Sequence, residues 1–96
     1  MARYDNELAV IGSVALKASC VEEIDRAGLS ADDFEDATCR TAFEVIEDLR
    51  QNRHPIDPVL IAEEMGRRVP GDHVKFLEQA MIYATTPANI SEYCRL

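Results

Sequence analysis

The chain has 96 residues, enough for one domain with a single hydrophobic core. Its hydrophobic fraction of 47% and charged fraction of 29% are typical of a folded globular protein and argue against a disordered tail. A net charge of −8 would repel a phosphate backbone, so the composition disfavours direct nucleic-acid binding and favours a basic or polar protein surface as partner.

The first predicted helix covers about residues 5–18, with Asp5 as its N-cap. Apolar residues recur at helical spacing here and along almost the whole chain, whereas strand-like alternation of β-branched residues is missing. Leu8, Ile11 and Ala15 should form the inner face of this helix.

A short second helix is predicted over about residues 20–27. Ser19 and Glu22 form a capping-box pattern at its start, and Gly28 stands where a left-handed residue would end it. The stretch LSADDF that follows should form a turn or a single helical turn capped by Ser30.

Two further helices are predicted in the middle of the chain. The third covers about residues 36–51 and carries one apolar stripe, formed by Ala42, Phe43, Ile46 and Leu49. The HPIDP segment should be extended, and Asp57 with Pro58 provides a cap and a first position for the fourth helix, to about Arg68.

The last two predicted helices follow the connector RRVPGD. Asp72 should cap a fifth helix to about Tyr83, whose expected inward-facing residues are Val74, Phe76, Leu77 and Met81. Thr86 and Pro87 should start a sixth helix that runs to Leu96 without a residue that would end it. The sequence therefore predicts an all-α fold, a compact orthogonal bundle of about six helices with the last one truncated.

No motif in the sequence indicates catalysis or metal binding. Asp32 and Asp33 are expected to sit in a first helical turn rather than act as an acid–base pair. His54 and His73 lack metal-ligand spacing and are expected to be solvated loop residues, and Cys39 is expected to be a packed side chain. The four glycines stand alone, so no phosphate-binding loop is present and ATP chemistry is not expected in this chain.

The N-terminus has no basic region followed by an apolar segment, and no apolar run approaches the roughly 20 residues that span a bilayer. Three cysteines are too few and too widely spaced for a disulfide framework or a CxxC zinc pair. We therefore expect a cytoplasmic protein, not inserted in a membrane, with buried or half-buried thiols at Cys20, Cys39 and Cys94.

Five short motifs occur in a defined order: ELAVIGSVAL (7–16), LSADDF (29–34), CRTAFEVIEDL (39–49), HPIDPVLIAEEM (54–65) and TTPANISEY (85–93). Their key positions are Glu7 with Val10, Ile11 and Gly12, then Asp33 and Phe34, Arg40 and Phe43, Pro55 to Asp57, and Ala88 to Ile90. In this order they resemble the N-terminal domain of bacterial replicative DNA helicases of the DnaB type. Glu35, Cys39 and a short GRRVPGD connector depart from the usual pattern of that family.

The resemblance implies a non-catalytic helical head domain over residues 1–96. In the family, a helical hairpin follows the head and pairs subunits into dimers, and three dimers build the N-terminal collar of the hexamer. The primase docks on this collar through its C-terminal domain. The ATP-hydrolysing motor, with its ATP and magnesium, follows after a linker, and DNA would be bound only by the rest of the parent protein.

Two groups of residues are candidates for contact with partners. Glu44, Glu47 and Asp48 form an acidic face on the third helix that would suit a basic partner, although a merely solvated face is the simpler interpretation. A second group lies on one face of the sixth helix, formed by Ile90, Tyr93 and Leu96. It would either pack on the head itself or continue into the dimer seam.

Other readings stay open at this level. A primase's own helicase-binding domain resembles this head in fold, and a stand-alone or phage-encoded module of the same fold would have no motor. A small helical enzyme or metal protein is disfavoured by the missing histidine, acid and cysteine spacing.

Overall fold

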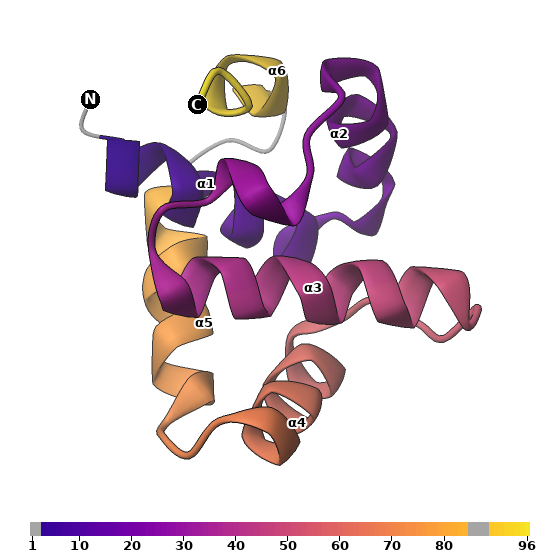
Figure 1. Ribbon diagram of the computed structural model, residues 1–96, viewed down its shortest axis with the longest axis vertical. Helices are drawn as coiled ribbons and strands as arrows, with labels where there is room; N and C mark the ends of the chain where they lie inside the picture. Colours follow the sequence, from indigo (N-terminus) through magenta and orange to yellow (C-terminus); the bar gives the residue numbers. More distant parts are fainter. Residues whose placement is uncertain (1–2, 85–88) are drawn as a thin grey trace.

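The computed structural model describes residues 3–84 and 89–96, which are helical with no strand (Figure 1). In chain order the helices are α1 (Arg3–Leu16), η1 (Ala18–Cys20), α2 (Val21–Ala27), η2 (Ala31–Asp33), α3 (Ala37–Gln51), α4 (Pro58–Arg68), α5 (His73–Tyr83) and α6 (Ile90–Tyr93). Those labelled η are single turns of 3-10 helix. The predicted all-α fold with about six α-helices is confirmed for the described residues.

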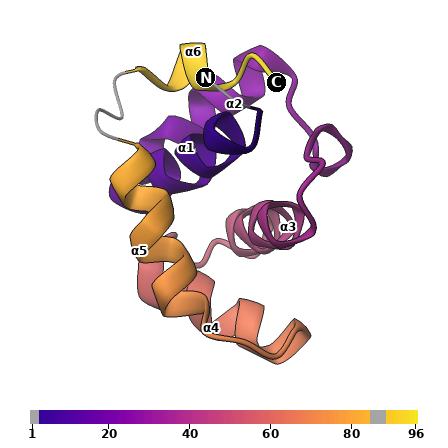
Figure 2. The same ribbon diagram turned by 90° about the vertical axis from the view of Figure 1, so that its left-hand side faces the viewer.

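Helix α1 lies at the centre of the fold. Every residue from Glu7 to Ala15 is buried, which is typical of a helix covered on all sides. It packs along α5 and also contacts α3, α4 and α6 (Figures 1 and 2). A Cβ atom at Gly12 would lie 2.0 Å from the carbonyl oxygen of Ala80, so the close approach of α1 and α5 requires glycine at this position.

The start of α2 differs from the prediction. Ser19 lies inside the 3-10 turn η1, and α2 begins at Val21 after Cys20, which makes no side-chain capping bond. Because Ser19 lies within a helical turn and not at the extended N-cap position of α2, the predicted capping box does not form. The end of α2 is as predicted, since Gly28 has a left-handed φ of 67°.

The three longer helices after η2 begin as predicted, because each follows an aspartate whose carboxylate accepts a backbone N–H of the first turn. These bonds are Asp36 with Cys39 N (2.9 Å), Asp57 with Leu60 N (2.9 Å) and Asp72 with Lys75 N (3.0 Å). The turn η2 is held by a capping box, in which the Asp33 carboxylate accepts the amide of Ser30 at 2.8 Å.

The inner face of α5 was predicted correctly except at Val74. Val74 is 58% exposed, whereas Leu77 and Ala80 are buried and Phe76 and Met81 are half-buried. The buried residues His73, Leu77 and Ala80 follow the spacing i, i+4, i+7, and this stripe faces the body of the protein. Val74 therefore lies on the solvent side of that stripe.

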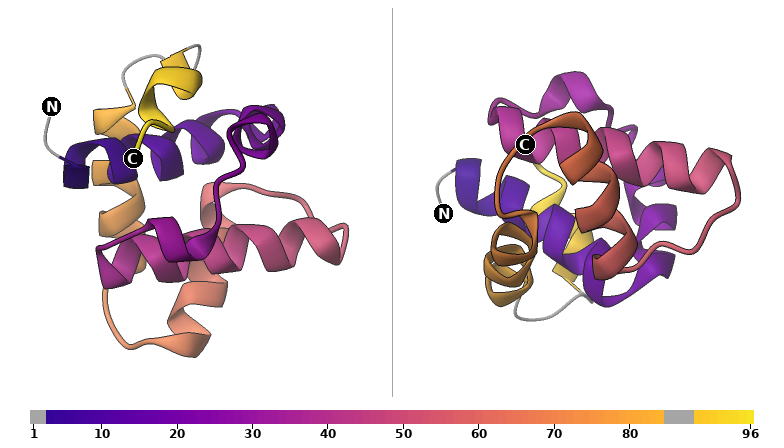
Figure 3. Two further views of the ribbon diagram at one scale, coloured as in Figure 1. Left: turned by 45° about the horizontal axis from the view of Figure 1, so that its top comes forward. Right: turned by 90° about the horizontal axis from the view of Figure 1, so that it is seen from below.

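One core joins all the helices. Phe34 and Phe43 are buried with ring centroids 4.7 Å apart, and they pack among aliphatic residues from α1, α3, α4 and α5. The molecule measures 30 × 27 × 23 Å, and α3 crosses α5 at a steep angle (Figures 1 and 3). The predicted compact orthogonal bundle is therefore confirmed.

Helix α6 is shorter than predicted and spans only Ile90–Tyr93. The predicted start at Thr86 and Pro87 lies outside the described residues. The amide of Arg95 bonds to the carbonyl of Glu92, three residues back, and this tighter pattern is how many α-helices end. In the described part of the chain, no helix is long and apolar enough to cross a membrane.

Candidate interaction surfaces

Glu7, the first residue of the first motif, is buried and holds a loop. Its side chain is 1% exposed, and its carboxylate oxygens accept the amides of Glu35 at 3.0 Å and Asp36 at 3.1 Å. The Nε atom of Arg3 lies 3.4 Å from the same carboxylate. The buried charge is thus matched by two N–H donors and a cation, which ties α1 to the start of α3.

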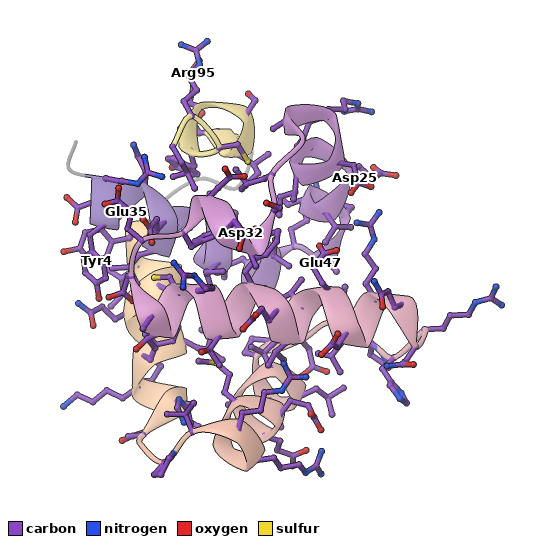
Figure 4. The ribbon with its side chains drawn as sticks, in the orientation of Figure 1. Tyr4, Asp25, Asp32, Glu35, Glu47 and Arg95 are labelled. Atoms are coloured by element: carbon purple, nitrogen blue, oxygen red, sulfur yellow. The ribbon has the colours of Figure 1, made fainter. Side chains whose placement is uncertain are left out.

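Arg40 holds the same loop from the other side. Its Nε and Nη2 atoms donate to the carbonyl oxygen of Phe34 at 3.1 and 2.8 Å. Arg3 Nη2 donates to the carbonyl of Asp33 at 2.6 Å. Three of the motifs therefore converge on residues 33–36, and their polar side chains stabilise the fold rather than form a reactive site. In Figure 4, Glu35 lies near one end of α1, and Asp32 lies on the turn η2 in front of α1.

The acidic face of α3 is partly engaged in ion pairs. Asp48 pairs with Arg68 of α4, and this contact joins two helices that also share the core. Glu44 is exposed and has no ion pair among the described residues. Of the three predicted partner-contact residues on this helix, Glu44 is the most available to a partner.

Glu47 lies beside an ion pair that links α3 to α2. Arg50 donates to Asp25 through two nitrogens, one of them at 2.7 Å, and this bond holds the pKa of the Asp25 carboxyl below its ordinary value. Burial raises the pKa of Glu47, with Arg50 opposing and the negative charges of Asp25 and Asp48 adding to the rise. Figure 4 shows Asp25 and Glu47 on neighbouring helices on one side of the molecule.

The predicted stripe of α6 lies against the head. Ile90 is 4% exposed, Tyr93 is 7% exposed, and the half-buried Leu96 packs on the same cluster. Helix α6 contacts α1 and α2, which together form the surface that it covers. Arg95 points away from this surface into solvent (Figure 4). Of the two arrangements considered from the sequence, the described residues adopt the one in which the stripe packs on the head itself.

The cysteines are buried, and burial disfavours their thiolate forms. Burial first, then the charge of Asp36 and a hydrogen bond to it, raise the pKa of Cys39 far above its ordinary value. Burial raises the pKa of Cys94 to about 11. The interpretation of Cys39 as a packed side chain is confirmed, since it is 0% exposed and carries its proton at neutral pH.

The two histidines differ in their surroundings. His54 is exposed, as predicted, but the expectation for His73 was wrong because this residue opens α5 and is only 8% exposed. Its Nε2 atom lies 2.5 Å from the carbonyl oxygen of Val69 and therefore donates a proton to it. The described residues contain no group of three potential metal ligands.

Hollows lie around the connector between α4 and α5, and no motif of the sequence indicated them. One of them, about 350 Å³, lies between the start of α3 and this connector, where Thr38, Met65 and Phe76 form part of its wall. Two smaller ones lie along α4 and α5 and share Val59 and Val74. Val59 is 67% exposed. The sequence shows only an apolar residue near the start of each of these helices, and such a residue does not by itself indicate an exposed position.

The fold and these contacts define a class of small all-helical domain in which the polar residues of the motifs stabilise a loop. Over residues 2–96 the chain matches the family described as DnaB-like helicase N terminal domain, and it belongs to that family. It is similar to the crystal structure of the N-terminal domain of DnaB helicase from Mycobacterium tuberculosis, with a TM-score of 0.77 and 25% sequence identity. That similarity covers 95% of this chain and 65% of the other, so the chain spans less than two thirds of its length. No curated protein sequence matches the chain.

Proposed function

We propose that this chain is a non-catalytic assembly and primase-interaction module of a replicative DNA helicase. It would contribute to the N-terminal collar of the hexamer in the cytoplasm, while ATP and magnesium would be bound by the motor domain of the parent protein. The observation that supports this proposal is the family match over residues 2–96 together with the shared fold. The match also favours a helicase head over a module carried by a primase.

The chemistry of the described residues agrees with a binding role. The buried thiols are protonated, and the buried carboxylate of Glu7 is fully occupied by backbone amides and a cation. Glu44 is the exposed acid of the α3 face, so we expect it to meet a basic residue of the primase C-terminal domain. The other expected contacts are with further helicase subunits.

The test is an NMR titration of the isotope-labelled chain with the primase C-terminal domain from the same organism. Localised shift changes on α3, with weaker binding after Glu44→Lys, would support the proposal. Glu22→Lys is the matched control, because Glu22 is an exposed acid on α2 and also has no ion pair among the described residues. A flat titration with folded protein would contradict recognition by this domain itself.

A further inference from the structure

Two hollows join into one groove between α4 and α5. Their volumes are about 310 and 170 Å³, and both are lined by Val59 of α4 and Val74 of α5. We call their joined surface the α4–α5 groove. Figure 3 shows the two helices from below, side by side and joined by their connector. The groove lies on neither α3 nor α6, so it is separate from the acidic face of α3 and from the apolar stripe of α6.

The lining residues repeat at helical spacing on both walls. On α4 they include Val59, Ala62 and Gly66, at i, i+3 and i+7. On α5 they include Val74, Leu77 and Met81, with the same spacing. Each wall is therefore one stripe about two turns, or roughly 10 Å, long. Two parallel stripes of this kind leave a channel into which the side-chain ridge of a third helix fits.

The floor of the groove is apolar and its valines are open to solvent. Val59 is 67% exposed and Val74 is 58% exposed, whereas Leu77 below them is 1% exposed. A single exposed valine is ordinary on a protein surface, but two that line one groove above a buried leucine form a continuous apolar strip. A partner helix with apolar residues at i, i+3 and i+7 would cover this strip.

The rim of the groove is acidic. Glu63 stands on the α4 side and Glu78 on the α5 side, and both are exposed. Neither carboxylate has an ion pair in the ranges that the structure describes, whereas the neighbouring Glu64 is paired with Arg67. Lysine or arginine residues that flank an apolar stripe would complement these two charges.

We infer that the α4–α5 groove binds about two turns of a cationic amphipathic helix from a partner protein. A second copy of this chain fits less well, because a symmetric contact would set Glu63 and Glu78 against the same acids and the chain as a whole carries a net charge of −8. Nucleic acid is disfavoured by the same charges.

The test uses a fluorescein-labelled peptide of about 18 residues, with leucine along one helical stripe and lysine on both sides of it. A peptide of the same composition in scrambled order is the control. Fluorescence anisotropy should show binding at least about tenfold tighter for the amphipathic peptide. Shift changes in the labelled chain should lie on α4 and α5.

Two double variants test the two parts of the surface. Val59→Ser with Val74→Ser should weaken binding about tenfold, because the apolar strip is lost. Glu63→Gln with Glu78→Gln should weaken it about threefold at low salt and reduce its salt dependence. All four residues are exposed, so the fold should be kept, and circular dichroism checks this.

The matched control is Glu22→Gln with Asp32→Asn, at two exposed acids outside the groove, which removes the same charge elsewhere and should leave binding unchanged. Equal loss of binding in this control, equal binding of the scrambled peptide, or shift changes on other helices would overturn the inference. So would sedimentation data in which the chain self-associates and the valine variant does not, because the occupant would then be a second copy. Failure of the primase titration would not affect these results.

Discussion

At the scale of single residues, the buried side chain of Glu7 holds the loop that precedes α3. The amides of Asp33 and Phe34 donate to the backbone carbonyls of Ser30 and Ala31, whereas those of Glu35 and Asp36 donate to the Glu7 carboxylate, which is almost fully buried. A buried carboxylate is stable only when its oxygens are matched by donors, and here both are. The Glu7 side chain thus helps to hold α3 in place relative to α1, together with Arg3 and Arg40.

We predict that Glu7→Gln lowers the free energy of unfolding by about 2 kcal/mol. The amide oxygen of glutamine can accept one N–H, but its NH₂ group would face the second N–H without an acceptor. Urea denaturation monitored by circular dichroism measures the change. The matched control is Glu35→Gln, which also lies near Arg3 but is 75% exposed, and its effect should stay within about 0.5 kcal/mol. Equal losses in both variants would contradict this role.

The roles of some single residues could be predicted from their neighbours in the sequence, whereas the roles of others could not. Asp36, Asp57 and Asp72 cap helices through amides three residues away, so their patterns are visible in the sequence. The partners of Glu7 lie 28 and 29 residues away, and no local pattern indicates them. Arg53 has a left-handed φ of 58° after α3, where glycine would be the expected signal, so the sequence did not mark this turn.

At the scale of helices, the contact between α1 and α5 depends on the missing side chain at Gly12. We predict that Gly12→Ala lowers the free energy of unfolding by more than about 3 kcal/mol, because the new Cβ would lie 2.0 Å from a backbone oxygen of α5 and the helices must separate. Thermal and urea denaturation measure the loss. A change below about 1 kcal/mol would show that the helices can shift without penalty.

Gly66→Ala is the matched control within α4. The nearest atom to its new Cβ is Cδ2 of His73 at 3.9 Å, which is ordinary contact, and alanine is the better helix former. This variant should therefore raise the free energy of unfolding by about 0.5–1 kcal/mol. If Gly12→Ala lowers the free energy of unfolding and Gly66→Ala raises it, the loss at Gly12 is caused by the close packing of α1 and α5 and not by helix propensity.

Helix α6 is held by its buried side chains rather than by its length. Tyr93 is 7% exposed, so we predict that Tyr93→Ala lowers the free energy of unfolding by about 3 kcal/mol at a concentration at which the chain is monomeric. Ser91→Ala, at an exposed position of the same helix, should change it by less than about 0.5 kcal/mol. Unchanged stability after Tyr93→Ala, with altered self-association, would instead assign this residue to a contact between subunits.

The existence of the longer helices was predictable, and so were the buried stripes of α1 and α3, but the exposure of Val74 on α5 was not. A stripe at i, i+3 and i+4 indicates a helix whichever neighbour covers it. In α5 both Val74 and Leu77 are apolar, and only the position of α1 decides that Leu77 is buried and Val74 is exposed. For this reason the sequence identified the acidic face of α3 but not the α4–α5 groove, which exists only once two helices lie side by side.

At the scale of the whole molecule, the buried thiols link stability to alkaline pH. An unfolded cysteine loses its proton near its ordinary pKa of 9.0, whereas burial keeps Cys94 protonated in the folded state up to about pH 11. The folded state therefore binds more protons between these values. We predict that this contribution to stability is fully present below about pH 9 and is lost as the pH rises towards about 11.

Urea denaturation in reducing buffer at several pH values tests this linkage. Cys94→Ala should be less stable than the natural chain at neutral pH, because a buried group is lost, but the difference should narrow as the pH rises. If the free energies of unfolding of the natural chain and of Cys94→Ala differ by the same amount from neutral to alkaline pH, Cys94 does not contribute to the pH dependence.

The central position of α1 has a consequence for synthesis on the ribosome. Many of its buried residues find their partners on α5 and α6, which lie about 60 or more residues later in the chain and so emerge from the ribosome later. Until then a helix whose residues from Glu7 to Ala15 are all buried in the fold lacks its main packing surface. The nascent chain therefore exposes the apolar residues of α1 until α5 has formed, which makes α1 an expected binding site for chaperones that act during translation.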